Sequence, residues 1–316
     1  MSSNYPNGFA QGVTIRGVPL TTTNPGQVFW VNNSAAIPFR GKGGSDGNPG
    51  TYQQPFSTVD YAISRCTANR GDIVAVMPGH NEGGSAAGLF DVDVAGVAVV
   101  GLGFGSARPT FDFDGTATTV IVSAANASLV NLNFRASVAD VVTGVQVDST
   151  NCRIDSCEFL EEASGDNFID FIETSASDNA VDGLAVTSCK VVSADTGNNS
   201  FVELNAVTNS FSLVGNHIQL GVAAGESVVG VSSTSDAITG IYIADNDIFR
   251  LNTQDALIFE GTANADTGLI VRNMIGHADA AGPLLIPTGS DVRMCENYSA
   301  GADDNSGRLI PVVEST

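Results

Sequence analysis

The octad FSLVGNHI, residues 211–218, returns in different letters as IYIADNDI, residues 241–248. In both copies a large apolar residue holds places one, three and eight, and an asparagine holds place six. Six more segments keep apolar residues at places one, three and eight and have leucine, cysteine or asparagine at place six, although the last of them has lost its final apolar residue. They begin at Val97, Ala127, Cys152, Leu184, Gly268 and Val292. Successive copies lie about 28 residues apart on average, so the sequence predicts a fold built from one repeated unit.

A second apolar segment precedes most octads, for example TGVQVDS, residues 143–149, and NFIDFIET, residues 167–174. Short strands in each repeat, with no amphipathic helix between them, are typical of the coils of a solenoid. A propeller blade needs a longer repeat, a leucine-rich repeat needs a helical half, and a β-sandwich would not keep one octad in phase eight times. We therefore expect an all-β parallel β-helix of about nine coils, closed near the C-terminus by GRLIPVVE, residues 307–314.

Neighbouring coils of a β-helix lie about 4.8 Å apart, so equal places of successive octads are expected to stack into a continuous apolar interior. At place three the stack would be Val99, Leu129, Ile154, Val186, Leu213, Ile243, Ile270 and Met294. At place eight it would be Phe104, Phe134, Phe159, Val191, Ile218, Ile248 and Ile275.

Place six carries leucine, then cysteine, then asparagine along the chain. The residues are Leu102, Leu132, Cys157, Cys189, Asn216, Asn246, Asn273 and Asn297. Asparagine tolerates the left-handed backbone of a tight corner, and its amide can donate and accept along the rod, so we expect a structural ladder. We expect Cys157 and Cys189 to be buried apolar fillers, with a redox pair as the alternative. Outward place seven, with Glu158, Lys190, His217 and Asp247, predicts a ladder of opposite charges.

The charge balance narrows the possible partners. The chain has 13 basic and 34 acidic residues and a net charge of −21, so we expect it to bind neither nucleic acid nor an anionic membrane surface. No apolar run approaches the ~20 residues of a membrane span, and the start lacks a basic leader and an apolar run. Five cysteines cannot all pair, which favours free thiols in a protein made in a reducing cytoplasm.

The N-terminal end of the rod needs a cap, because a terminal coil would otherwise expose strand edges and core. The segment PFSTVDYAISRCTANRGD, residues 55–72, predicts a short helix with Ser57 as N-cap and Asp60 completing a capping box. The helix would end near Gly71 and be followed by the first coil strand within DIVAVMPG, residues 72–79. Its apolar face would be Val59, Ala62, Ile63 and Cys66.

Residues 1–50 fit no coil in the repeat alignment. We therefore divide the chain into an N-terminal arm, residues 1–50, and a capped β-helix, residues 51–316. As a hypothesis the arm attaches the rod to a partner, and the alternative is a segment that lies along its own coils. The apolar anchors of that partner-binding site would be Phe9, Val28, Phe29, Trp30 and Phe39.

Two stretches resemble a known family. GGSDGNPGTYQQPFSTVDYAISRCTANRGDIVAVMPGH, residues 43–80, resembles the start of right-handed parallel β-helix (pectate-lyase-like) proteins. NGFAQGVTIRGVPLTTTNPGQVFWVNNS, residues 7–34, resembles leaders of β-helix proteins of tailed bacteriophages. The resemblance implies a virion structural protein. The expected role is a homo-oligomeric capsid decoration protein bound to the major capsid protein or other virion proteins, and a tail fibre or spike subunit or a receptor-binding module is the alternative.

The rival of a different class is a polysaccharide lyase or hydrolase. Hydrolases of this fold carry a Gly-His-Gly motif, which does not occur here, and an Arg-x-Lys motif, which occurs only as residues 40–42 in the N-terminal arm. NTQD, residues 252–255, is only a weak echo of their acidic motif. A lyase needs a Ca²⁺-binding carboxylate cluster and a basic proton acceptor. The candidate acid pairs are Asp91 with Asp93, Asp112 with Asp114, and Asp245 with Asp247, and no lysine lies near them in the sequence. We expect these pairs to be solvated strand edges, with no catalytic residue, metal or cofactor.

Overall fold

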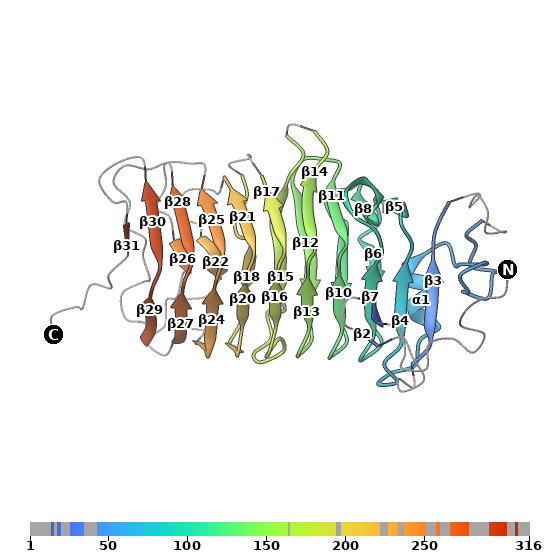
Figure 1. The fold of residues 1–316 in the computed structure, drawn as a ribbon, viewed down its shortest axis with the longest axis horizontal. Helices are drawn as coiled ribbons and strands as arrows, with labels where there is room; N and C mark the ends of the chain where they lie inside the picture. The colour runs from blue at the N-terminus through green and yellow to red at the C-terminus, as the bar shows by residue number, and fades with distance from the viewer. Residues whose placement is uncertain are drawn as a thin grey trace, which may run out of the picture.

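The chain folds into an elongated rod of short strands wound in successive coils (Figure 1). The structure is a computed structural model. It describes residues 14–15, 18–19, 26–34, 43–163, 165–193, 197–221, 227–232, 237–250, 257–259, 266–277, 291–301 and 307–308. Within these residues the predicted class, an all-β parallel β-solenoid, is confirmed.

The first of three long sheets has ten strands, and every neighbouring pair in it is parallel. It contains the first half of each octad. From the N-terminal end its strands are β3 (Val28–Val31), β4 (Ile73–Val76), β7 (Ala98–Gly101), β10 (Ser128–Val130), β13 (Arg153–Asp155), β16 (Ala185–Thr187), β20 (Ser212–Val214), β24 (Ile241–Ala244), β27 (Thr267–Val271) and β29 (Asp291–Cys295).

The second sheet also has ten strands, and in every octad except the first its strand begins at place seven. All its neighbouring pairs are parallel except the last, in which β31 runs antiparallel to β30. Its strands are β5 (Asn81–Gly84), β8 (Thr110–Phe113), β11 (Asn133–Ala136), β14 (Glu158–Glu161), β17 (Lys190–Val192), β21 (His217–Leu220), β25 (Asp247–Arg250), β28 (Met274–His277), β30 (Tyr298–Gly301) and β31 (Gly307–Arg308).

The third sheet holds the second apolar segment of each repeat and has seven strands. About seven turns therefore carry all three faces within the described residues, fewer than the nine that we expected. These strands are β6 (Gly88–Asp91), β9 (Thr119–Val122), β12 (Val141–Val147), β15 (Phe168–Thr174), β18 (Val202–Leu204), β22 (Ser227–Val231) and β26 (Leu257–Phe259). Two small sheets join β1 (Thr14–Ile15) to β2 (Val18–Pro19), and β19 (Thr208–Asn209) to β23 (Ile238–Thr239).

The predicted stack at place three is confirmed over its whole length. Each of its eight residues lies directly opposite the next in the parallel register, from Val99 to Met294. The column continues beyond the octads through Val74 to Phe29 at the N-terminal end. Burying one such side chain contributes about 1.5–3 kcal/mol, so the repeated register supplies much of the stability of the rod.

The stack at place eight is confirmed from Phe134 to Ile275, but the prediction for Phe104 is wrong. Phe104 is 74% exposed, and Phe111 lies opposite Phe134 in its place. A one-turn 3-10 helix, η1 (Gly105–Ala107), follows Phe104 and lengthens this corner before β8 begins. The insertion moves the aromatic ring out of the core, and the strand that follows restores the register.

The corners of the coils depend on residues with positive φ, but not on the asparagines that we expected to adopt it. Place five, one residue earlier, carries the left-handed backbone in seven of the eight octads. The residues are Asn131, Ser156, Ser188, Gly215, Asp245, Arg272 and Glu296, with φ between 55° and 67°. A second column of positive φ precedes place one in most coils, and its members include Gly96, Asn126, Asn151, Gly183, Ser210 and Gly240. Left-handed residues therefore bracket most short strands of the first sheet.

A short helix covers the N-terminal coils, as predicted, but its cap is a different residue. Helix α1 (Val59–Ser64) begins after Thr58, whose hydroxyl accepts a hydrogen bond from the Tyr61 N–H at 3.3 Å. Ser57 instead donates its backbone N–H to Asp46 Oδ1, which also accepts from the Thr58 N–H. Val59, Ala62 and Ile63 are buried as expected, and Cys66 is half-buried. No helix in the described parts of the chain is long and apolar enough to cross a membrane.

Candidate functional sites on the rod surface

The predicted anchor residues lie within the coils to a greater extent than the sequence suggested. Val28, Phe29 and Trp30 belong to β3, which pairs in parallel with β4, so the expectation that residues 1–50 fit no coil is wrong for this strand. Phe29 points inward at place three, and its ring lies 6.1 Å from that of Phe56. Val28 and Trp30, one residue to either side, lie on the outward face. Phe9 and Phe39 lie outside the described residues.

The free edge of β3 is covered by the chain that follows it. The Trp30 N–H donates to the Gly50 carbonyl, and the Trp30 carbonyl accepts from the Phe56 N–H, both at 2.9 Å. The rings of Trp30 and Tyr52 meet edge to face with centroids 5.0 Å apart. Trp30 is half-buried and Tyr52 is 36% exposed, so this pair presents part of an aromatic surface at the N-terminal end.

A buried histidine joins three N-terminal elements, and the sequence analysis did not single it out. His80 is 1% exposed. Its Nδ1 accepts from the Asn33 N–H at 3.1 Å, and its Nε2 lies 3.0 Å from Glu82 Oε2. The same Glu82 oxygen accepts from the Val59 N–H at the start of α1, at 3.1 Å. These contacts tie the segment after β3, the first coil and the cap into one unit.

Asp72 fixes the beginning of the first coil. Its buried carboxylate accepts hydrogen bonds from the Gln27 and Thr67 N–H groups at 2.6 and 2.7 Å. Arg70 adds a bidentate ion pair, in which Nε lies 2.7 Å from Asp72 Oδ1 and Nη2 lies 2.6 Å from Asp72 Oδ2. Burial by itself would raise the pKa of the Asp72 carboxyl, but the hydrogen bonds from Arg70, Gln27 and Thr67 together lower that pKa below its ordinary value.

Two of the three candidate acid pairs are engaged by arginines from the next coil. Arg135 grips Asp112 through Nε at 2.6 Å and Nη2 at 2.8 Å. Arg272 grips Asp245 in the same way, with both distances 2.7 Å. The sequence analysis did not foresee these ion pairs, because stacking brings the arginines to the carboxylates from 27 and 23 positions away in the sequence, for Asp245 and Asp112 respectively. The hydrogen bonds from Arg272 lower the pKa of Asp245.

Two of the pairs also fail to form a shared face. Asp245 occupies a left-handed corner with φ of 57°, whereas Asp247 begins the next strand, so the two carboxylates belong to different sheets. Asp91 accepts from the Ser123 hydroxyl at 2.7 Å, and Asp93 is exposed beyond the end of β6. Within the described residues there is no group of three or more His, Cys, Asp and Glu side chains that could hold a metal ion.

The outward charge ladder at place seven is confirmed. Lys190 Nζ lies 2.7 Å from Glu158 Oε1, and His217 Nδ1 lies 2.9 Å from Asp247 Oδ2. Arg108 reaches Glu158 from the opposite side at 3.1 Å. Exposed pairs of this kind contribute about 0–1 kcal/mol each, so the ladder is more important for register than for stability.

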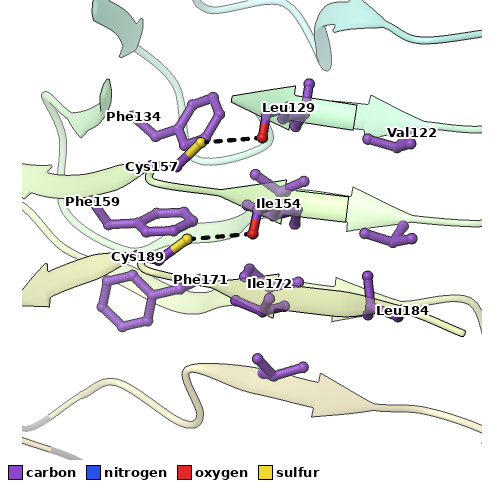
Figure 2. Close-up of a cluster of buried hydrophobic side chains, with 14 of the residues drawn as sticks. Val122, Leu129, Phe134, Ile154, Cys157, Phe159, Phe171, Ile172, Leu184 and Cys189 are labelled. Atoms are coloured by element: carbon purple, nitrogen blue, oxygen red, sulfur yellow. Dashed lines mark hydrogen bonds between the residues drawn. The ribbon is translucent and has the colours of Figure 1, made fainter. Parts of the chain in front are cut away.

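Cys157 and Cys189 occupy the buried corner, as predicted, and are not bonded to each other. Figure 2 shows each thiol directed at the carbonyl of the coil before it, Cys157 toward Leu129 at 3.7 Å and Cys189 toward Ile154 at 3.6 Å. Burial raises the pKa of the Cys189 thiol well above its ordinary value. A protonated thiol packed beside Phe159 is a poor nucleophile, which agrees with a filler role.

One polar patch was missed by the sequence analysis. On the outward face of the third sheet, Glu173 lies directly opposite Glu203 of the next coil. Glu173 accepts from the Thr143 hydroxyl and from Asn205 Nδ2, the latter at 2.8 Å. Gly230 follows in the same row, and a side chain there would collide with the Glu203 carboxylate. The available signal was a glutamate at the third place of FIET, residues 171–174, and of FVEL, residues 201–204, in the segments that precede two successive octads.

No protein-family model and no curated protein matches the chain. Among solved structures, a rhamnogalacturonan lyase is similar with a TM-score of 0.47 and 13% sequence identity, over 90% of this chain and 90% of the lyase chain. The similarity concerns the β-helix architecture alone.

Proposed function

We propose that the chain is a non-enzymatic structural protein of a tailed-bacteriophage particle, a decoration protein of the head surface that attaches through its N-terminal segment. The observation that carries the proposal is the engagement of the candidate acids. A lyase would need Asp112 and Asp245 to bind a cation, but each forms a bidentate ion pair with an arginine of the next coil. Each carboxylate therefore links its own coil to the next coil through charge-assisted hydrogen bonds.

The shape of the molecule supports the same role. Three parallel sheets share one interior along the rod, so each coil is supported by the coils on both sides. Such a rod has little freedom to bend around a substrate. Its acidic surface, with a net charge of −21, keeps it from nonspecific contact with the packaged nucleic acid.

The virion assignment itself rests on the resemblance of residues 7–34 to leaders of β-helix proteins of tailed bacteriophages. The N-terminal end is the proposed attachment end, because the aromatic pair of Trp30 and Tyr52 lies there and the first 25 residues precede it. The proposed partners are the major capsid protein and further copies of this chain. A tail fibre or spike subunit is the nearest alternative within the same class.

The test is reconstitution onto particles that lack the protein. Purified full-length protein is expected to bind such particles and to appear on the head in electron micrographs. A variant without residues 1–25 is expected to keep its β-rich circular dichroism spectrum and lose binding. The deletion stops before Gly26 because β3 and Asp46 belong to the folded cap. Equal binding by the shortened variant, density on the tail, or no binding by the full-length protein would each contradict the proposal.

A polysaccharide lyase or hydrolase is the second candidate, and the pair Glu173 and Glu203 is the observation that favours it. Most glycoside hydrolases use a pair of carboxyl groups, and these two glutamates lie opposite each other on adjacent coils. The test incubates the protein with host capsule and assays reducing ends and the ultraviolet absorbance of unsaturated sugars. Activity that disappears in both Glu173→Gln and Glu203→Gln, but persists in Asp247→Asn, would replace the structural proposal with this one.

A further inference from the structure

The first sheet presents an apolar face to the outside at its N-terminal end. Strand residues alternate between the two faces, so the neighbours of the inward place-three residues point away from the core. In β3, β4 and β7 every such residue is apolar. They are Val28, Trp30, Ile73, Ala75, Ala98 and Val100. At the equivalent positions of β10, β13 and β16 the face becomes mostly polar, with Ser128, Arg153, Asp155 and Thr187.

Three of these six outward residues are nevertheless buried, and the other three are half-buried. Ile73 is 4% exposed, Ala75 0% and Val100 2%, although all three point away from the core. By contrast, Arg153 is exposed, and Asp155 and Thr187 are half-buried. Apolar side chains on an open sheet face do not reach such values unless another segment covers them.

Long side chains on the same face explain burial elsewhere in this sheet but not here. Ala244 and Val271 are also buried outward residues, and there Arg272 Nη2 reaches across the face to the Tyr242 hydroxyl at 3.4 Å. On β3, β4 and β7 the only long outward side chain is Trp30, which is itself half-buried. A covering segment from outside these strands is therefore required.

The N-terminal hairpin is in position to provide this cover. β1 and β2 pair antiparallel, and Figure 1 places β2 at the level of β7 along the rod, alongside the coils and not beyond their end. The six residues between Pro19 and Gly26 span up to about 20 Å, twice the ~10 Å that separates β3 from β7 across the sheet. Gly26 itself packs tightly on the Gly71 carbonyl, so the chain enters the first sheet at this edge.

The composition of the segment fits the same surface. Residues 1–25 contain none of the 34 acidic residues of the chain and one of its basic residues, Arg16. A segment with a single positive charge complements a rod whose remaining residues are strongly acidic. The sequence around the hairpin, VTIRGVPL, residues 13–20, supplies four large apolar residues for an apolar face.

We infer that the hairpin Thr14–Pro19 docks onto the outward face of β3, β4 and β7 of its own chain. This docking does not depend on the proposed virion role. It explains why Ala75 and Val100 are buried without a partner protein. If a phage particle binds the N-terminal segment, the hairpin must first dissociate from this face of the sheet.

Limited trypsin digestion of the free protein tests the docking, with cleavage after Arg16 followed by mass spectrometry. The variants Ala75→Asp and Val100→Asp place a charge under the hairpin. Each is expected to accelerate cleavage after Arg16 about tenfold or more, because proteolysis follows the population of the open state. Val214→Asp is the matched control, since Val214 holds the same outward place on β20 and is half-buried. It lies five strands beyond Ala75 and four strands beyond Val100 along the sheet. This control is expected to leave the rate unchanged.

Hydrogen exchange keeps the test decisive if a variant is unstable. In the wild-type protein the amides of β1 and β2 are expected to exchange slowly, and in Ala75→Asp rapidly, while β13 stays protected in both. Two results would overturn the inference. One is equally rapid cleavage after Arg16 in the wild type and the variants. The other is acceleration confined to Arg40, which would assign the cover to residues 35–42.

Discussion

A column of four asparagines shows how single residues stabilise the C-terminal half of the rod. The amide nitrogen of Asn246 donates to the Leu213 carbonyl and to Asn273 Oδ1, both at 2.9 Å. Its own oxygen accepts from the backbone N–H and the side-chain nitrogen of Asn216, also at 2.9 Å. Asn246 is 2% exposed, so every polar atom of its side chain is satisfied without water.

Replacing Asn246 with alanine is expected to destabilise the protein by about 2–4 kcal/mol, because two buried donors of Asn216 lose their acceptor. Urea unfolding followed by circular dichroism measures the change. His217→Ala is the control, because His217 directly follows Asn216 in the sequence but is exposed. Its ion pair with Asp247 contributes less than about 1 kcal/mol. Equal losses in the two variants would contradict the role of the ladder.

Asp72 is expected to make stability depend on acidic pH. Its pKa in the folded protein lies below the ordinary value of 3.8, so its contribution is complete above that value and is lost as the pH falls through the folded pKa. Asp72→Asn is therefore expected to be less stable than the wild type at pH 7, with a difference that narrows below about pH 4. Thermal unfolding between pH 7 and pH 3 measures it. A difference that stays constant with pH, or an identical loss in the exposed control Asp247→Asn, would contradict the assignment.

At the scale of the element, most strands of the first sheet are short because corners limit them on both sides. A left-handed residue stands before place one and another at place five, which leaves a central strand of three or four residues. The side chain that stacks and the residue that turns are therefore neighbours with separate tasks. At the corner after β20, Gly215 adopts the left-handed backbone and Asn216 makes the hydrogen bonds.

The helix cap gives a prediction that separates two neighbouring residues. Thr58→Ala is expected to cost about 1 kcal/mol, because the Thr58 hydroxyl accepts from the Tyr61 N–H and donates to Asp46. Ser57→Ala is expected to be nearly neutral, since Ser57 binds Asp46 through its backbone. Chemical unfolding of both variants checks this. A larger loss of stability in Ser57→Ala than in Thr58→Ala would instead support Ser57 as the N-cap, as the sequence pattern predicted.

At the scale of the whole molecule, charge repulsion is the main electrostatic term. Paired arginines neutralise only a few of the 34 acidic residues. The melting temperature is therefore expected to rise by several degrees between about 10 mM and 500 mM sodium chloride, because salt screens the repulsion over about 10 Å at 0.1 M and less above. Differential scanning calorimetry measures the change. A fall in melting temperature would show that the ion pairs outweigh the repulsion.

The repeat made the register predictable, and departures from the repeat did not follow from it. Eight octads of equal length determine which residues stack, so the place-three column could be derived from spacing alone. Phe104 broke the pattern because it lies between Gly103 and Gly105, which both have positive φ, and a 3-10 turn follows it. The periodicity of the octads does not encode this local insertion. The alignment also followed only one corner of the coil, so Glu173 and Glu203 on the third sheet were overlooked.

The reversed direction of β31 has a consequence for how these rods can associate. By pairing antiparallel with β30, it occupies the hydrogen-bonding edge on which a second rod would otherwise continue the second sheet. At the opposite end, Gly50 and Phe56 occupy the edge of β3 in the same way. The chain thus blocks polymerisation through these two edges, and copies that assemble around a common axis would have to do so flank against flank.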